Sequence, residues 1–367
     1  MQRRELLKQS ALAVAAFSFS RNLFAREADA TVFPGYNTAA IIKLSSNENP
    51  HGPSPAARKA MSAVVNNCNR YPWETTTVLR EKIGASFGLV KENVLIGAGS
   101  SELLGLVACR AALQKGNIVA PDPTFRLWMP AARQSGAPVK LVGLDAKKGI
   151  DLQRLKDAID KDTRMVYICN PNNPTGTVLP AGDLESFIRQ LPAHITVLLD
   201  EAYTEFENTP TTTPLVKDHP NLVVAKTFSK IYGMAGARIG YAIAHTDTIR
   251  QLADLQPWAN AGAGTVALAG AVASYEEASF IDYCRKENTR ARQIFYRALE
   301  KNSIPYIPSA TSFVYFDTTS YRKDFRAALE SRQIIGARTF EENSKWLRLS
   351  VGTADEMEKV AEAISTG

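Results

Sequence analysis

Cysteine and histidine are scarce in this 367-residue sequence, with four residues of each type. No two cysteines form a CxxC pair and the histidines are equally scattered, so the spacing of a metal centre or a dithiol redox site is absent. We therefore predict no metal ion, and we interpret the thiols as small, buried apolar side chains. The four cysteines are Cys68, Cys109, Cys169 and Cys284.

Concentrated charge is also missing. The 43 basic and 37 acidic residues give a formal net charge of +6, but no Lys/Arg run interleaves with aromatic residues. Nucleic-acid binding therefore has little support. Apolar residues make up 45% and charged residues 22%, which excludes a disordered tail protein and a multi-pass membrane protein. The length predicts one large domain with a smaller companion.

The first 30 residues have the order of features found in an export signal. Arg3-Arg4 precede Leu-Leu-Lys, an apolar stretch follows at 11–19, and small-residue patterns end at 25 and 30. The paired arginines resemble the twin-arginine export signal, and the apolar stretch is too short for a stable membrane anchor. The alternative is an N-terminal helix packed on the domain of a cytoplasmic protein. We favour export, to the periplasm or beyond, with residues 1–30 as the signal.

Short apolar runs alternate with longer amphipathic runs from residue 90 onward. The apolar runs are rich in Val, Ile and Leu and predict buried strands, whereas the stretches between them predict helices. This alternation predicts an α/β fold with a mainly parallel sheet flanked by helices, whose ligands bind beyond the carboxyl ends of the strands. The predicted strands are 93–96, 118–120, 165–169, 195–199 and 221–225, and the predicted helices include 101–113, 152–159 and 182–190.

The pattern changes after about residue 286. A long charged helix precedes a strand at 313–316, a helix near 323–331 and a strand at 346–351, which together predict a smaller α+β domain at 286–367. Residues 31–55, rich in Pro, Asn and Ser, are predicted to join this small domain, and residues 56–285 are predicted to form the large domain.

A lysine follows the last of the predicted large-domain strands, at the end of the sequence TFSK. Lys230 can form an imine with an aldehyde cofactor if burial and a nearby cation lower its pKa. Thr227, Ser229 and Arg238 offer two hydroxyls and a guanidinium that match a phosphate group. Lys226 is a competing candidate, but it lies within the strand and lacks the Ser-Lys neighbourhood.

Two further motifs also follow predicted strands. Asp200 needs a cationic partner, and a protonated pyridine nitrogen is one; the alternative is an aspartate that caps the next helix. Tyr203 can then donate a hydrogen bond to the hydroxyl of the same ring. The loop NPNNPTG after 165–169 holds the amide of Asn173 in one place, facing that oxygen, because two Asn-Pro steps restrict the loop.

A small-residue loop, GAGSSE at 97–102, joins a predicted strand to a predicted helix. Backbone amides at such a helix start form a phosphate cradle, so Ser100, Ser101 and Glu102 are candidate cofactor-binding residues. The glycine spacing fits neither a dinucleotide-binding nor a P-loop pattern. Phe125, in the sequence PDPTF, is expected to stack on a flat ring or else to pack in the core.

An arginine interrupts the apolar run WLRLSVG at 346–352. Burying Arg348 without an anion is unfavourable, so a substrate α-carboxylate is a natural partner and a structural ion pair is the alternative. Arg338 either receives a second anionic group of the substrate or belongs to the charged surface.

Together, in this order and at these intervals, the motifs resemble the fold-type I pyridoxal-phosphate enzymes, within the class I and II aminotransferases, from about residue 40 to the C-terminus. The sequences SNENPHG at 46–52 and RYP at 70–72 are most similar to the histidinol-phosphate aminotransferase branch. The resemblance implies pyridoxal 5'-phosphate as cofactor, amino acid and 2-oxo acid substrates, and a homodimer with shared active sites.

The resemblance also implies roles for individual residues. Lys230 would carry the cofactor as a Schiff base, Asp200 would pair with its pyridine nitrogen, and Asn173 and Tyr203 would hold its ring oxygen. Phe125 would stack on the ring; Ser100, Ser101, Thr227, Ser229, Arg238 and, from the other subunit, Tyr71 would surround the phosphate; and Arg348, Asn49, His51 and Arg338 would lie at the substrate.

Two features depart from that branch. The family commonly has Tyr where this chain has His51, close to the substrate. An export signal is also unexpected for a histidine-biosynthetic enzyme, because that pathway is cytoplasmic. Both departures argue against histidinol phosphate as the substrate.

The predicted reaction is an amino transfer in two stages. An amino donor displaces Lys230 from the cofactor, the freed amine moves the Cα proton, and a second oxo acid reverses the sequence. The nearest alternative is decarboxylation or C–S β-elimination with the same cofactor, which would need no keto-acid acceptor. A remote alternative is a non-catalytic amine- or cofactor-binding protein, which the presence of both Lys230 and Asp200 disfavours.

Overall fold

The structure is a computed structural model that describes residues 41–365. The predicted export signal at 1–30, and the first part of the predicted joining segment at 31–55, lie outside the described residues. Among the helices that the structure describes, none is long and apolar enough to span a bilayer. The residues from Ile42 onward cluster as one unit.

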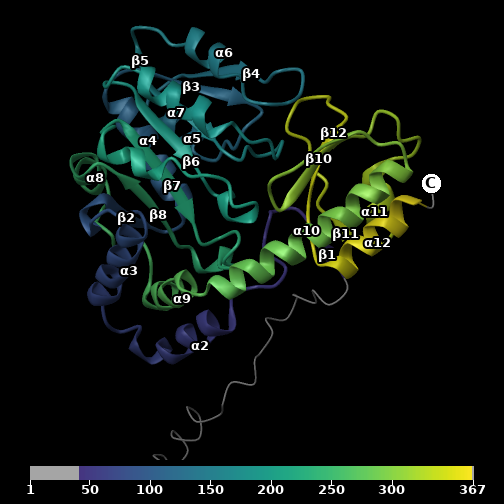
Figure 1. The fold of residues 1–367 in the computed structure, drawn as a ribbon, viewed down its shortest axis with the longest axis horizontal. Helices are drawn as coiled ribbons and strands as arrows, with labels where there is room; N and C mark the ends of the chain where they lie inside the picture. The colour runs from purple at the N-terminus through teal and green to yellow at the C-terminus, as the bar shows by residue number, and fades with distance from the viewer. Residues whose placement is uncertain (1–40, 366–367) are drawn as a thin grey trace, which may run out of the picture. The chain divides into compact units, whose positions relative to one another are not determined.

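Seven strands form the central sheet in the order β2-β8-β7-β6-β5-β3-β4 (Figure 1). Four adjacent pairs are parallel, whereas β8 runs antiparallel to both β2 and β7. The sheet is therefore mainly parallel, as predicted. Its strands are β2 (Val94–Gly97), β3 (Asn117–Asp122), β4 (Val139–Gly143), β5 (Thr163–Cys169), β6 (Thr196–Asp200), β7 (Leu222–Thr227) and β8 (Gly240–Ala244).

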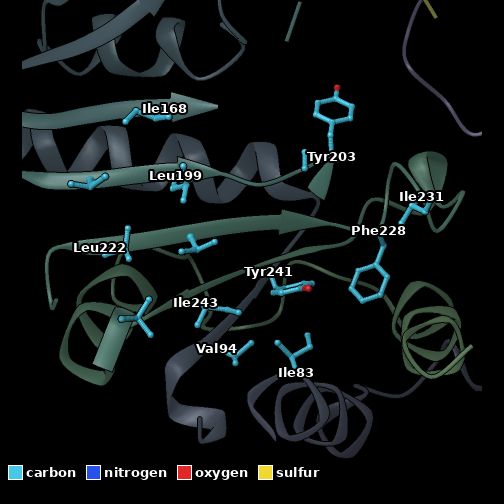
Figure 2. Packing of buried hydrophobic residues seen from close by; sticks show 14 of the residues in the cluster. Ile83, Val94, Ile168, Leu199, Tyr203, Leu222, Phe228, Ile231, Tyr241 and Ile243 are labelled. Atoms are coloured by element: carbon cyan, nitrogen blue, oxygen red, sulfur yellow. The ribbon is translucent and has the colours of Figure 1, made fainter. Parts of the chain in front are cut away.

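Helices cover both faces of this sheet, because both faces of its inner strands are apolar. In β6, Val197 and Leu199 face one hydrophobic core and Leu198 faces the other. Figure 2 shows part of the first core, where Ile168, Leu199 and Leu222 come from three neighbouring strands. The first core is covered by α3 (Trp73–Ser86), α6 (Leu152–Asp157), α7 (Ala181–Gln190) and α9 (Thr265–Tyr275), and the second by α4 (Ser100–Leu113), α5 (Met129–Gln134) and α8 (Thr246–Ala253).

A separate group of elements follows along the chain. Three antiparallel strands, in the order β12-β10-β9, enclose a third hydrophobic core with three helices. A two-stranded parallel sheet pairs β1 with β11, so the start of the described chain lies beside residues near its end. These elements are β1 (Ile42–Lys43), α10 (Ala278–Lys301), β9 (Tyr306–Ile307), β10 (Phe313–Asp317), α11 (Phe325–Glu330), β11 (Ile334–Ile335), β12 (Trp346–Ser350) and α12 (Ala354–Ser365).

The long helix α10 takes part in two of the three cores (Figure 1). Its buried face runs through Cys284, Asn288, Ala291, Phe295 and Leu299, at the three- and four-residue spacing of one helical stripe. Cys284 packs in the core of the central sheet, whereas the last three pack in the C-terminal core. The predicted boundary between residues 285 and 286 therefore falls inside a continuous helix, and the two-domain division stays a prediction.

Two strands of the central sheet, β4 and β8, were not among those predicted. β4 is an edge strand whose residues are half-buried or exposed, so it lacks the continuous apolar run that marks the inner strands. β8 is fully buried, but it is short and contains two alanines and a glycine, which weakens the pattern of a strand. Its antiparallel direction could not be read from an alternating β and α pattern.

The prediction that all four thiols are buried is wrong for Cys68, which is exposed, and only partly right for Cys109, which is half-buried. Cys68 follows the short 3-10 helix Val65–Asn67 after α2 (Pro55–Ala63), a segment that packs only on one side. Cys169 and Cys284 are buried, as predicted.

Candidate active site

A cavity of about 420 Å³ opens at the carboxyl ends of β5, β6 and β7. The register places these ends together, because Cys169 is opposite Asp200 and Asp200 is opposite Ala225. Figure 2 shows Tyr203 lying beyond the end of β6. The predicted residues that line the cavity are Ser100, Ser101, Phe125, Asn173, Asp200, Tyr203, Thr227, Ser229, Lys230, Arg238, Arg338 and Arg348.

Asp200 is the last residue of β6 and is 3% exposed. Its Oδ2 accepts a hydrogen bond from the hydroxyl of Tyr167 at 3.0 Å, and its Oδ1 accepts one from the backbone N–H of Ala202 at 3.2 Å. Burial raises the pKa of Asp200 to about 6, and the Tyr167 and Ala202 hydrogen bonds oppose that rise. A cation in the cavity would therefore stabilise the ionised form of this carboxylate.

Lys230 follows β7 and enters the cavity from the neighbouring strand. Its Nζ donates to the backbone oxygen of Ser46 at 3.1 Å and lies 5.7 Å from the ring centroid of Tyr203. Burial lowers the pKa of Lys230 to about 8, and the nearby Arg348 lowers it further against the opposing charge of Asp200. An amine with such a pKa has a substantial neutral, nucleophilic fraction near neutral pH.

Lys226, the competing candidate, has a different environment. It lies within β7 and its Nζ is 3.1 Å from a carboxylate oxygen of Glu201 and 3.0 Å from one of Glu205. These two carboxylates raise the pKa of Lys226 although burial lowers it, so the amine stays protonated. Lys226 does not line the cavity, which leaves Lys230 as the candidate nucleophile.

Tyr203 and Asn173 meet at one point of the cavity wall. The hydroxyl of Tyr203 accepts from Nδ2 of Asn47 at 3.0 Å and from Nδ2 of Asn173 at 3.3 Å. Burial raises the pKa of Tyr203 above its ordinary value, which keeps the phenol protonated and able to donate a hydrogen bond. The hydroxyl and the two amides thus form one hydrogen-bonded cluster in the buried wall of the cavity.

The start of α4 forms a tight approach between two segments. Gly99 has φ +81°, and a Cβ built on it would lie 2.3 Å from Nη2 of Arg238, so only glycine fits there. Arg238 itself has φ +55°, a strained conformation for a residue with a side chain. Its guanidinium donates to the backbone oxygens of Ala235 and Ala98. Because these partners are neutral carbonyl oxygens, the guanidinium of Arg238 keeps its positive charge beside the start of α4, where it can bind an anion.

Arg348 lies in the middle of β12 and is 5% exposed. Its Nη1 donates to Oδ1 of Asn173 at 2.6 Å and its Nη2 donates to the backbone oxygen of Ser45 at 2.8 Å, whereas its buried Nε has no partner. Burial lowers the pKa of Arg348 to about 10. Among the residues that the structure describes, no carboxylate forms an ion pair with it, so the structural ion pair considered above is not observed.

Arg338 and Phe340 bring a loop to the same side of the cavity. The backbones of Arg338 and Arg348 exchange two hydrogen bonds, at 3.0 and 2.8 Å. The ring of Phe340 lies 4.7 Å from Cζ of Arg348, which is a cation–π distance. Two arginines therefore face one cavity, and the charge of Arg338 further lowers the pKa of Arg348.

These residues fit pyridoxal phosphate on observations of the site itself. A buried carboxylate suits a protonated ring nitrogen, a half-buried amine with a lowered pKa suits an aldehyde, and a helix start beside Arg238 suits a phosphate. The orphan Nε of Arg348 suits a substrate carboxylate. Within residues 41–365, no three His, Cys, Asp or Glu side chains gather to hold a metal ion.

The structure leaves three residues that were predicted for this chain's own site, Glu102, Asn49 and His51, outside the lining of this cavity. The carboxylate of Glu102 accepts from the backbone N–H of Ala98 at 2.5 Å and from Gln256 at 2.8 Å, so it fastens the loop before α4 instead of facing the cavity. Tyr71, which was predicted to reach the phosphate of the other subunit, is 70% exposed and stacks on Trp73, with 5.3 Å between the ring centroids, and its role stays a prediction.

Asn49 and His51 also lie outside the cavity lining. Nδ2 of Asn49 donates to the backbone oxygen of Ile231 at 2.7 Å and to the sulfur of Cys284. His51 packs edge-on against Tyr283, with 5.1 Å between the ring centroids, and burial lowers its pKa. In this structure, Asn49 ties the segment after β1 to α10, and His51 packs against the same helix.

Asn47, Phe340 and Tyr167 contact residues of the site but were not singled out in the sequence. Asn47 lies in the quoted SNENPHG segment, but its contact with Tyr203 joins positions 156 residues apart. Phe340 lies in a loop without a motif. Tyr167 stands inside an apolar strand, where an aromatic residue indicates only core packing. No local pattern could have identified the last two.

Comparison with known proteins agrees with this arrangement. A family model for aminotransferases of class I and II matches residues 39–364. The histidinol-phosphate aminotransferase of Geobacillus sp. (strain WCH70) is 35% identical over 336 residues, which cover 90% of this chain and 91% of that protein.

Solved structures share the fold. One from Erwinia carotovora atroseptica has a TM-score of 0.84 at 34% identity and covers 90% of this chain and 96% of its own. The histidinol-phosphate aminotransferase from Sinorhizobium meliloti, solved in complex with pyridoxal-5'-phosphate, has a TM-score of 0.80 at 24% identity, covering 89% of this chain and 91% of that one.

Proposed function

This chain belongs to the aminotransferase class I and II family and is a pyridoxal-phosphate-dependent transaminase, and from this premise we propose that Lys230 carries the cofactor and moves the proton of the reaction. The observation that carries the proposal is that one cavity contains both a half-buried amine with a lowered pKa and a buried carboxylate with a raised pKa. Opposite shifts of this kind mark an acid–base pair.

The cofactor-binding residues are assigned by their chemistry. Asp200 holds the ring nitrogen, Tyr203 and Asn173 hold the ring oxygen, and Phe125 lies against the ring. The phosphate is bound at the start of α4, by Ser100, Ser101, Thr227, Ser229 and Arg238. When bound, the cofactor supplies an aldehyde for the substrate amine and an aromatic ring that withdraws electrons from the substrate Cα.

The protein's own residues supply the remaining steps. Nζ of Lys230, as the free amine, accepts the proton from the substrate Cα and later returns a proton, since its lowered pKa makes both directions accessible near neutral pH. The charge of Asp200 keeps the ring nitrogen protonated. Asp200 is 3% exposed, so little water reaches its carboxylate.

We assign substrate binding to the two arginines. Arg348 binds the α-carboxylate, because its guanidinium lines the cavity and has no carboxylate partner among the described residues. Arg338 receives a second acidic group when the substrate has one. The relatives named for histidinol phosphate make that compound a member of the substrate panel, together with dicarboxylic, aromatic and aliphatic amino acids.

The test is amino transfer from each panel member to 2-oxoglutarate, followed by detection of both products. We expect turnover that requires the 2-oxo acid. Product formation without any 2-oxo acid acceptor, with loss of CO₂ or of a sulfur group, would instead indicate decarboxylation or elimination. The control is the Lys230→Ala variant, which should give no products above the background of free cofactor.

We further propose that the protein is a homodimer. Tyr71, Trp73 and Trp258 are 70%, 40% and 55% exposed and contact one another beside a hollow of about 610 Å³. Ala98 and Glu102 line the same hollow, and they flank the phosphate-binding loop. Exposed aromatic clusters of this kind are typical of protein interfaces, and a partner seated here would close the site from outside.

The oligomeric state is tested by sedimentation of the wild-type protein and of Trp258→Glu. We expect a dimer that the substitution weakens, with a parallel loss of cofactor affinity. Leu141→Glu, on the exposed edge strand β4, is the matched control and should leave the dimer intact. A wild-type protein that sediments as a monomer at micromolar concentration contradicts the proposal.

We also propose that the protein is exported through the twin-arginine route. The support is the sequence alone, because residues 1–40 lie outside the described part of the chain. The test is fractionation of cells producing the full chain and its Arg3→Lys, Arg4→Lys double variant, with the N-terminus read by mass spectrometry. We expect a shortened protein outside the cytoplasm for the wild type only. A full-length wild-type chain confined to the cytoplasm contradicts export.

A further inference from the structure

Tyr167 places a hydroxyl group inside a buried, mostly apolar strand. It lies in the middle of β5, is fully buried, and packs against Trp128 with 4.9 Å between the ring centroids. Its neighbours Val166 and Ile168 are apolar, and a phenylalanine would fill the same space. A buried phenol requires a hydrogen-bond partner, so its hydroxyl must be explained by what it contacts.

That contact is Asp200. The strand register places Tyr167 opposite Leu198, two residues before Asp200, and the length of the tyrosine side chain brings its hydroxyl to Oδ2 of Asp200 at 3.0 Å. Cys169 is directly opposite Asp200 but its thiol bonds to the backbone oxygen of Pro171 instead. Tyr167 is thus the residue of β5 that bonds to the carboxylate.

The two hydrogen bonds to Asp200 restrict how it can turn. Tyr167 occupies Oδ2 and the backbone N–H of Ala202 occupies Oδ1, so each oxygen has one donor from the protein. Asp200 still lines the cavity, so the carboxylate borders the space assigned to the cofactor ring. A carboxylate bonded in this way is fixed in orientation before anything binds.

The direction of the Tyr167 bond is also fixed. Burial raises the pKa of Tyr167 well above its ordinary value, so the phenol remains an O–H donor throughout the pH range of the enzyme. A donor stabilises the ionised form of an acceptor carboxylate, and this hydrogen bond lowers the pKa of Asp200 against the effect of burial. The other charges near Asp200 are Lys230, which acts in the same direction, and Glu201, which opposes it.

We propose that Tyr167 is a positioning residue that keeps Asp200 ionised and aimed at the ring nitrogen of pyridoxal phosphate, and so sets the lower pH limit for tight cofactor binding. It rests on the proposed role of Asp200 and extends it to a residue outside the cavity. Tyr167 makes no contact with the cofactor space, so it acts only through Asp200.

The test is the equilibrium affinity of the apo protein for pyridoxal phosphate, measured at pH 6 and pH 8 for the full chain and for Tyr167→Phe. Loss of the donor raises the pKa of Asp200, so the carboxylate is mostly protonated at pH 6 and still ionised at pH 8. We expect affinity to fall about tenfold or more at pH 6 and clearly less at pH 8, since hydrogen bonds to charged groups are among the stronger ones.

Tyr241→Phe is the matched control. Tyr241 is also a buried tyrosine of the central sheet, at 1% exposed, but it lies in the other core and its hydroxyl is near Tyr275. This variant loses a buried hydroxyl without touching Asp200. We expect the ratio of its affinities at pH 8 and pH 6 to differ from the wild-type ratio by less than about twofold.

Two results overturn the inference. One is a Tyr167→Phe protein whose affinity has the wild-type pH dependence, and the other is a loss of equal size at both pH values. If the wild type itself binds no pyridoxal phosphate, the proposed function fails first and Tyr167 is not the cause.

A second measurement covers a Tyr167→Phe protein that does not fold. The carboxyl carbon of Asp200 and the Cζ carbon of Tyr167 are followed by ¹³C NMR in the wild-type apo protein as pH changes. We expect both signals to titrate together near pH 6, because the phenol hydrogen bond changes when its acceptor is protonated. A Tyr167 signal that stays constant while Asp200 titrates contradicts the inference.

Discussion

The two sides of the cavity are built differently. On the cofactor side, Asp200, Tyr203 and Lys230 come from the ends of adjacent strands, and the first two are at most 3% exposed. On the substrate side, Arg338 and Phe340 lie on the loop between β11 and β12, which contains no helix or strand. One side is held by a sheet and two cores, and the loop on the other by the two backbone hydrogen bonds between Arg338 and Arg348 and by a few side-chain contacts.

The substrate-side loop is fastened mainly through Glu341. Its carboxylate accepts from Nζ of Lys148 at 3.2 Å, from the hydroxyl of Ser344 at 3.2 Å and from that of Tyr315 at 3.4 Å. Lys148 also lies over the ring of Trp346, at 5.2 Å. Since the side chains of Lys148 and Glu341 are 23% and 30% exposed, water competes for this contact.

This difference indicates which kinetic property depends on each side of the cavity. Groups that handle a proton need fixed positions and shifted pKa values, and both follow from burial at the strand ends. Groups that select a substrate can adjust, so a loop with half-exposed contacts is sufficient. We therefore expect changes on the cofactor side to abolish the reaction or shift its pH range, and changes on the substrate side to alter KM.

The largest expected effect is that of Lys230→Ala. Turnover should fall by about 10²–10⁴-fold, because the residue that carries the Cα proton is missing. The variant should still bind pyridoxal phosphate, since Asp200 and the phosphate-binding loop are unchanged. Turnover with a saturating amino acid and 2-oxo acid, and dialysis against buffer without cofactor, measure the two properties.

Lys226→Met tests the role of the other lysine of this region, which lies within β7, four residues before Lys230. It leaves Glu201 and Glu205 without their cation in the core, so unfolding free energy should fall by about 3–5 kcal/mol. Cofactor attached to Lys230 should still resist removal by dialysis at a temperature where the variant is folded. An intact Lys230 that no longer retains cofactor would contradict the assignment of the two lysines.

The next effect in size concerns Arg348→Gln. Removing the buried guanidinium should raise KM for every amino acid by about 30-fold or more, because truncating a buried charge partner costs about 2–5 kcal/mol. Arg338→Gln is the comparison: it should raise KM only for substrates with a second acidic group. Equal effects of both substitutions on a monocarboxylic amino acid would argue against separate roles.

The folding stability of the apo protein should depend on pH through Asp200 and Lys230. The folded pKa of Asp200, about 6, lies above its ordinary value of 3.8, so protonation favours folding and stability should fall as pH rises from about 4 to 6. The folded pKa of Lys230, about 8, lies below 10.5, so stability should recover as pH rises between these values.

Thermal unfolding of the apo protein from pH 4 to 10 measures this profile. In Asp200→Asn the fall between pH 4 and 6 should flatten, and in Lys230→Met the recovery above pH 8 should flatten. Wild-type profiles that neither substitution changes would place both pKa shifts elsewhere.

The smallest expected effect is that of Lys148→Met. Loss of a half-exposed ion pair should raise KM about two- to fivefold and leave kcat unchanged. The neighbouring exposed Lys147, changed to Met, controls for the loss of one positive charge. Added salt should reduce the difference between wild type and Lys148→Met. A changed kcat would mean that the loop acts on the cofactor side as well.

The sequence was sufficient to predict site residues where a local motif contained the reactive side chain. The TFSK lysine, the aspartate after an apolar strand and the NPNNPTG loop each predicted a residue that lines the cavity, because parallel strands bring their carboxyl ends to one edge. Five strands of the central sheet, β2, β3, β5, β6 and β7, were predicted to within one or two residues, since they are almost fully buried and leave continuous apolar runs.

Sequence was insufficient where two distant segments meet. The Tyr167–Asp200 bond depends on strand register, and the Asn47–Tyr203 bond depends on how the segment after β1 returns to the cavity. Glu102 was placed on the cofactor from its loop, but Gln256, 154 residues away, turns its carboxylate elsewhere. The predicted boundary at 286 falls inside α10, because one helix can serve two cores without a break, and the two-domain division stays a prediction.

The most direct test of the central claim is the absorption spectrum of the purified protein, recorded with pyridoxal phosphate before and after a panel of amino acids is added. We predict a yellow band that one class of amino acid bleaches and that a 2-oxo acid restores, with Lys230→Ala lacking this cycle. A colourless wild-type protein that takes up no pyridoxal phosphate would contradict the assignment of Lys230 and Asp200 to cofactor chemistry.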